Sequence, residues 1–141
     1  MTTKLMGQKV QRVEDQRFLR GQGRYADDIA VGQDVLHAAV LRSPHAHARI
    51  VDIDVYAVLD VEGVHAVWTY DDLVGPMAEP LPLLIPHPAL THGRTQFALE
   101  RDEVNHVGEA IAFVVADDRY VAEDAVARIR VEFDLLPPVV G

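Results

Sequence analysis

The stretch AIAFVVADDRYVAEDAVARIRVEFDL, residues 110–135, decides the fold of this chain. Its first seven residues are all apolar, which is the pattern of a short buried strand. Asp117 or Asp118 can then accept backbone hydrogen bonds as the N-cap of a helix. That helix carries a single apolar face, and residues 131–135 after it alternate between apolar and acidic side chains. We therefore expect a strand, a helix and a second strand in succession.

The residues upstream of this stretch predict several more short elements. Strands are expected at residues 35–41, 49–55, 64–69 and 101–107, with Gly108 between the last of these and the apolar run. Val51, Ile53 and Val55 are expected on one face of their strand, because side chains alternate along a strand. Brief helices are expected after Asp54 and after a capping box of Thr69 and Asp72. Gly63 is suited to end the first of these helices.

Prolines mark a long irregular segment in the middle of the chain. Five of the eight prolines fall within residues 75–99, where they exclude a central strand or a helix interior. Strands mixed with a few helices, without regular strand–helix–strand spacing, indicate the α+β class. We expect a mixed sheet with a few helices in residues 31–141, interrupted by a proline-rich excursion at 75–99. Residues 1–30 are expected to form a basic arm with a glycine-rich loop.

The composition of the chain excludes several classes of function. The chain has 141 residues, no cysteine and a net charge of −9, which excludes a disulfide framework, an iron–sulfur ligand set and a cysteine nucleophile within it. No apolar run approaches the length of a membrane helix, and a cytoplasmic, globular domain is expected. Residues 1–26 hold six cationic against two acidic residues, a net +4, whereas the remainder holds seven against 20, a net −13. An acidic body argues against nucleic acid, and the arm is expected to dock on an acidic neighbouring surface.

Few residues carry a recognisable chemistry. Gly21, Gly23 and Ala26 match the glycine pattern of a dinucleotide loop, but a charged segment precedes them instead of a strand, which argues against nucleotide binding. Ser43 is the only serine, and with Pro44 after it there is no nucleophile elbow. Four histidines are candidate ligands for a metal site, although their spacing matches neither a helical pair of histidines four residues apart nor an H-E-x-x-H helix. These histidines are His45, His47, His87 and His92.

Seven segments in order nevertheless resemble one enzyme family. They are LRGQGRYADDI (19–29), LHAAVLRSPHAHARIVDI (36–53), GVHAV (63–67) with DL (72–73), VGEAIAFVVA (107–116), AEDA (122–125), VEF (131–133) and LPPVV (136–140). Together they resemble the N-terminal domain of the large, molybdenum-binding subunit of the xanthine dehydrogenase and aldehyde oxidase family. The RSPH form of the loop is most similar to the carbon monoxide dehydrogenase branch. The resemblance covers almost the whole chain.

The resemblance implies an α/β-hammerhead fold and a parent oxidoreductase. Such enzymes hydroxylate a carbonyl or heteroaromatic substrate, or oxidise carbon monoxide, using a molybdopterin cofactor with FAD and iron–sulfur clusters on partner subunits or domains. The pterin loops, the glutamate base and the copper-binding cysteine of the family correspond to no position here. We therefore expect a structural domain that binds no cofactor and is not catalytic alone. It is expected to pack on the cofactor-binding remainder of the large subunit.

One loop is the predicted contact with that neighbouring domain. Its residues are Arg42, Ser43, Pro44, His45, His47 and Arg49. Arg42 or Arg49 is expected to pair with a carboxylate across the interface, because an arginine recognises a carboxylate through paired hydrogen bonds. A stand-alone binding module, possessing the histidine metal site named above, is the alternative function.

Overall fold

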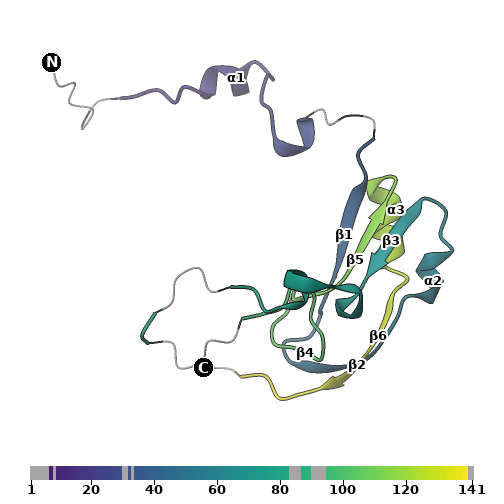
Figure 1. Cartoon of the computed structure of the whole chain (residues 1–141). Helices are drawn as coiled ribbons and strands as arrows, with labels where there is room; N and C mark the ends of the chain where they lie inside the picture. The colour runs from purple at the N-terminus through teal and green to yellow at the C-terminus, as the bar shows by residue number, and fades with distance from the viewer. Residues whose placement is uncertain are drawn as a thin grey trace. The chain divides into compact units, whose positions relative to one another are not determined.

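A computed structural model describes residue 7, residues 9–29, residue 32 and residues 34–82, 87–89 and 95–139. The chain divides into two compact units, Met1–Asp34 and Val35–Gly141. The sequence places the end of the basic arm at residue 30, and the first unit ends four residues later, after Asp34. Figure 1 shows both units along the chain.

The N-terminal unit contains a short helix and a tight return of the chain. Helix α1 spans Asp15–Leu19, and the 3-10 helix η1 spans Ala26–Asp28. Between them Gly21 has a φ of +67°, and the rings of Phe18 and Tyr25 stack with centroids 6.3 Å apart. A Cβ on Gly23 would lie 3.1 Å from the Phe18 ring. These glycines therefore permit a turn and a close aromatic contact, and no strand precedes them in the described residues.

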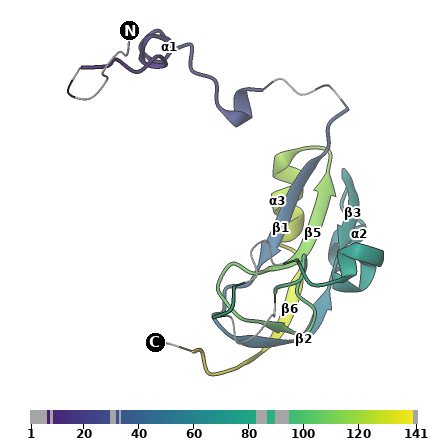
Figure 2. The same cartoon turned by 60° about the vertical axis from the view of Figure 1, so that its left-hand side comes forward.

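The second unit contains two three-stranded sheets. In sheet A the order is β1 (His37–Arg42), β5 (Ala110–Ala116), β3 (Val64–Trp68); in sheet B it is β4 (Glu103–Val104), β2 (Ala48–Asp54), β6 (Arg130–Leu135). The α+β class is confirmed. The expected mixed sheet is not found, because every strand pair among the described residues is antiparallel. Figure 2 shows β1, β5 and β3 side by side, with β2 and β6 beyond their lower ends.

Helix α3 (Arg119–Val126) covers one face of sheet A and is the predicted helix. Asp118 is its N-cap, with Oδ1 accepting a 2.9 Å hydrogen bond from the Val121 amide. Ala122 and Ala125 are buried, and Ala125 packs with Ala112 and Val114 of β5 in the main core. Among the described residues no helix has the length and apolarity needed to cross a bilayer.

Two strands depart from the expected alternation of buried and exposed side chains. The pairing of β2 with β6 shifts register between Ile50 and Asp52, and the pairing of β3 with β5 shifts between Val64 and Ala66. Val51 is consequently 55% exposed, whereas Ile50 and Ile53 both pack on the core. The prediction that Val51 shares a face with Ile53 is wrong, because one extra residue in a bulge reverses the side-chain direction.

Short helices and turns follow the predicted signals more closely. Asp54 accepts the Tyr56 amide before helix α2 (Tyr56–Leu59), and Gly63 has a φ of +84°. Thr69 and Asp72 form the capping box of η2 (Tyr70–Asp72). Within the proline-rich segment η3 spans Gly75–Ala78, and the Leu81 amide donates to the Gln96 carbonyl.

The predicted strand at 101–107 is much shorter than expected. Only Glu103 and Val104 pair with β2, since the chain then turns through Gly108, whose φ is +93°. The Glu109 amide closes this turn by donating to the His106 carbonyl. A left-handed glycine favours such a turn over a continuous strand.

Removing the α3 cap should destabilise this unit. Asp118→Ala deletes the acceptor for the Val121 amide and should lower the free energy of unfolding by about 1 kcal/mol. Asp124→Ala, which removes an exposed carboxylate from the same helix, is the control and should have an effect near zero. Urea unfolding followed by circular dichroism measures both. Equal losses in the two variants would contradict the capping role.

Candidate functional site

Ser43 anchors the predicted interface loop to the start of β5. Its amide donates to the Glu109 carbonyl and its carbonyl accepts from the Gly108 amide, both at 2.8 Å. Its hydroxyl donates to the His45 carbonyl and accepts from the His45 amide, both at 3.0 Å. Ser43 is 2% exposed. The only serine of the chain therefore holds a turn and has no free hydroxyl for nucleophilic chemistry.

The two arginines of the loop contact groups of their own chain. Arg42 Nη1 donates to the Gly108 carbonyl at 2.8 Å. Arg49 Nη1 lies 3.1 Å from Asp134 Oδ2, with both side chains 57% exposed. Exposed pairs of this kind contribute little to stability. Both arginines and the neighbouring Pro44 face solvent, and pairing across a domain interface stays a prediction for them.

His47 ties the loop to two distant segments. Its Nδ1 lies 2.7 Å from the Pro137 carbonyl and its Nε2 lies 2.7 Å from Glu103 Oε1. Because both partners are acceptors, the geometry favours an imidazolium that donates from both nitrogens. The Pro137 carbonyl, followed by the Glu103 carboxylate, raises the pKa of His47 above its ordinary value. The Leu136 amide also donates to the His47 carbonyl, so the segment after β6 is held twice.

The three candidate metal ligands that the structure describes do not form a cluster. Both nitrogens of His47 are engaged, and the His45 ring packs edge-on against Phe133 with centroids 4.8 Å apart. His87 Nδ1 accepts a hydrogen bond from the Ala89 amide. His92 lies outside the described residues. Within the part of the chain that the structure describes, no three His, Cys, Asp or Glu side chains could hold a metal ion together.

A buried carboxyl pair lies beside the loop and was not predicted from the sequence. Glu100 and Glu109 are each 5% exposed and share a hydrogen bond, which requires one proton between them. Glu100 Oε1 accepts from the Phe97 amide at 3.0 Å, and Glu109 accepts from the Asn105 amide. Burial, then the Glu109 charge, raises the pKa of Glu100 to about 7. The available signal was Glu109 itself, an acid directly beside an apolar run.

A pocket of about 520 Å³ opens over this pair. Its lining residues are Thr95, Gln96, Phe97, Glu100, Arg101, Asp102, Glu103, Asn105 and Glu109. Four carboxylates against one arginine disfavour a phosphate-bearing group such as molybdopterin or FAD, and the cysteine-free chain offers no iron–sulfur ligands. The pocket does not fit the cofactors that the resemblance implies for the parent enzyme.

Stability should fall as the pH rises through the titration of Glu100. The folded chain holds a proton that the unfolded chain releases near pH 4.5, so unfolding becomes easier between pH 4.5 and about 7 and levels off above. Glu100→Gln keeps an acceptor for Phe97 and a donor for Glu109 without a charge. It should raise the free energy of unfolding at pH 8 by about 2 kcal/mol.

Chemical denaturation at pH 5 and pH 8 measures this effect, with the exposed Glu132→Gln as the control. An unchanged pH profile in Glu100→Gln would refute the shared proton.

His47 should make the stability of the folded chain depend on pH in a second, higher pH range. Because its folded pKa is raised, its stabilisation is fully present below the ordinary histidine value of 6.5 and is lost as pH rises through the folded value. His47→Gln should flatten the profile above pH 6.5, whereas the exposed His37→Gln should leave it unchanged. Thermal unfolding between pH 6 and 9 measures the slope, and NMR titration of the ring reads the pKa of His47 directly.

Comparison with known proteins places this geometry in one family. Residues 20–137 match the family model described as "Aldehyde oxidase and xanthine dehydrogenase, a/b hammerhead domain". The chain is 40% identical over 127 residues to the carbon monoxide dehydrogenase large chain of Hydrogenophaga pseudoflava, covering 90% of this chain and 15% of that one. It is 40% identical over 143 aligned positions to the nicotine 6-hydroxylase large subunit of Paenarthrobacter nicotinovorans, covering 99% of this chain and 17% of that one.

Solved structures agree with the sequence matches. The quinoline 2-oxidoreductase of Pseudomonas putida 86 superposes with a TM-score of 0.81 at 40% identity, over 99% of this chain and 17% of that chain. A Cu,Mo-CO dehydrogenase superposes with a TM-score of 0.77 at 40% identity, over 96% of this chain and 16% of that chain. The chain thus spans about one sixth of the length of these relatives. It belongs to the aldehyde oxidase and xanthine dehydrogenase family, as a hammerhead domain of that family.

Proposed function

We propose that the chain is the structural hammerhead domain of a molybdenum hydroxylase and packs on the cofactor-binding part of the large subunit. The observation that carries this proposal is the 40% identity to large chains over nearly the whole of this chain, against only 15–17% of theirs. The engaged Ser43 hydroxyl and the two hydrogen-bonded ring nitrogens of His47 support a domain that holds its shape and leaves the chemistry to other polypeptide.

The relatives support a proposal for the activity of the parent enzyme. We propose an oxidoreductase that uses molybdopterin outside these residues, with FAD and iron–sulfur clusters on partner subunits or domains. The relatives include a carbon monoxide dehydrogenase and a nicotine 6-hydroxylase, so the proposed substrate class lies among such small molecules. A cytoplasmic location is part of the same proposal, since a chain without cysteine needs no oxidising compartment.

The loop from Arg42 to Arg49 is the proposed contact with the cofactor-binding part. Ser43 and His47 fix its two ends through hydrogen bonds, so Arg42 and Arg49 project from a rigid frame. Their contacts to Gly108 and Asp134 are exposed and can exchange for a carboxylate on a neighbour at little cost. A preorganised cation lowers the entropy lost on association.

The basic N-terminal arm is a second proposed contact. Its described cations are exposed, and the apolar Val13 and Leu19 beside them are 92% and 87% exposed. The cations are Lys9, Arg12, Arg17, Arg20 and Arg24. A partner surface that is acidic with an apolar centre would satisfy both features.

Substitution of the loop arginines tests the proposal. Arg42→Ala and Arg49→Ala should each weaken binding by about 2 to 5 kcal/mol if their charges become buried on assembly. The binding partner is the carbon monoxide dehydrogenase large chain of Afipia carboxidovorans, another 40% identical relative, with its aligned segment deleted. Calorimetry measures binding of the full 141-residue chain, and Arg128→Ala, another exposed arginine, is the control.

Unchanged affinity in both loop variants would show that the arginines do not form the contact. Absence of any binding by the unsubstituted chain would contradict the structural role itself.

A further inference from the structure

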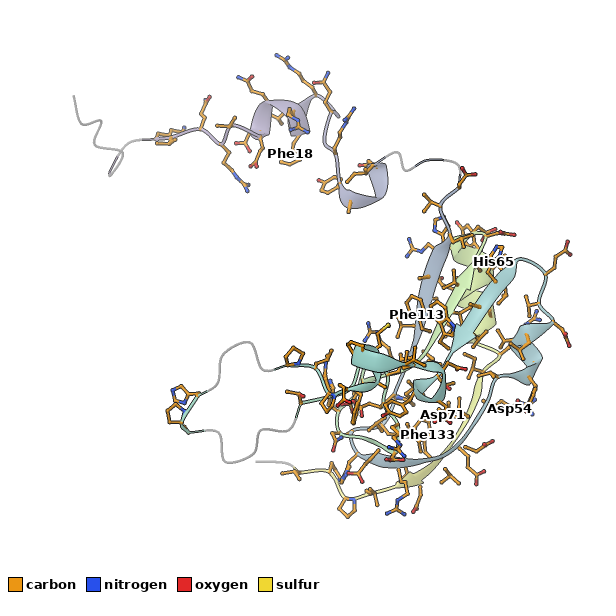
Figure 3. The ribbon with its side chains drawn as sticks, viewed as in Figure 1. Phe18, Asp54, His65, Asp71, Phe113 and Phe133 are labelled. Carbon is orange, nitrogen blue, oxygen red and sulfur yellow. The ribbon has the colours of Figure 1, made fainter. Side chains whose placement is uncertain are left out.

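The outer face of sheet A is an uncharged apolar surface. Residues directly opposite each other in antiparallel strands share a face. Phe113 lies opposite Val40 on one side and Trp68 on the other, and Val115 lies opposite Ala38 and Ala66. The outer face is therefore defined by Ala38, Val40, Ala66, Trp68, Phe113 and Val115. Phe113, labelled in Figure 3, belongs to β5, the central strand of this sheet.

The two faces of β5 differ sharply in burial. Ala112, Val114 and Ala116 are fully buried on the side that α3 covers. On the outer face Phe113 and Val115 are only half-buried, and Trp68 is 43% exposed. The Trp68 ring stacks parallel to the Phe113 ring, with centroids 5.8 Å apart. An exposed tryptophan stacked on a half-buried phenylalanine is typical of protein contacts, in which aromatic side chains are enriched.

Charge argues against a second copy as the partner. Each copy carries a net charge of −9, so two copies would repel, and the six residues that define this face include no cation to compensate. The relatives point to a different occupant, because the domain makes up only 15–17% of their chains. In addition, β1 ends at Arg42, so the outer face continues directly into the proposed interface loop.

We infer that the outer face of sheet A docks on an apolar surface of the polypeptide that carries the cofactor-binding part of the enzyme. This inference rests on the proposed function and names the surface that it uses. Trp68 and Phe113 form the centre of the contact, since large aromatic side chains contribute most of the binding energy in protein interfaces. Ala38 and Ala66 flank them and let the partner approach the sheet closely.

The single tryptophan gives a direct readout. The full chain is produced with 5-fluorotryptophan, so that its one fluorine resonance reports Trp68. The probe partner is the same segment-deleted large chain of Afipia carboxidovorans. Docking should shift this resonance and remove its response to solvent. Ala38→Glu, at an exposed position of β1, should weaken binding by about tenfold because it places a charge in an apolar contact. Tyr120→Glu, on the solvent side of α3 where Tyr120 is 79% exposed, is the matched control and should bind normally.

The outcomes separate the two proposals. Binding with an unchanged fluorine resonance, and equal affinity for Ala38→Glu and Tyr120→Glu, would overturn the docking face while leaving the structural role intact. No binding by the unsubstituted chain would overturn both. Sedimentation of the chain alone gives the remaining test. A dimer that dissociates when Ala38→Glu is introduced would identify a second copy of the chain as the occupant of this face and would contradict the inference. Circular dichroism confirms that each variant is folded.

Discussion

Close packing of small side chains between β5 and α3 is the constraint on which the second unit depends. Ala112 of the strand and Ala125 of the helix are both completely buried in one cluster. Alanine brings the helix near the sheet without a gap, and interiors tolerate few voids. Since β5 also pairs with β1 on one side and β3 on the other, its position sets the whole of sheet A.

Hydrogen bonds at the start of β5 connect this packed core to the candidate site. Gly108 and Glu109 bond to Ser43 through their backbones, and Gly108 also accepts from Arg42. Through its side chain Glu109 joins Glu100, so the interface loop, the turn before β5 and the buried acidic pair form one bonded unit. The shape of the loop is thus coupled to a proton that is shared away from solvent.

Sequence patterns predicted the elements whose signals are local. The apolar run of β5, the cap at Asp118 and the capping box at Thr69 each depend on neighbours within a few residues, and each is present. Features that depend on distant pairing were missed. The bulge at Val51 reflects the register with β6, and the partner of His47 is 90 residues away at Pro137.

One part of the candidate site was predicted from the sequence and another part was not. A family resemblance pointed to the loop around Ser43. Only folding brings Glu100 beside Glu109, because Glu100 looks like an ordinary surface acid in the sequence and nothing local links the two. Burial of a carboxyl depends on what packs over it.

The bulge at His65 has a consequence for solubility. β3 is an outer strand of sheet A, and an outer strand exposes a row of amide and carbonyl groups that can recruit another chain. One extra residue between Val64 and Ala66 interrupts that row and bends the strand. A flat edge beside the apolar Trp68 would be a template for aggregation, and the irregular edge makes such growth of the sheet unfavourable.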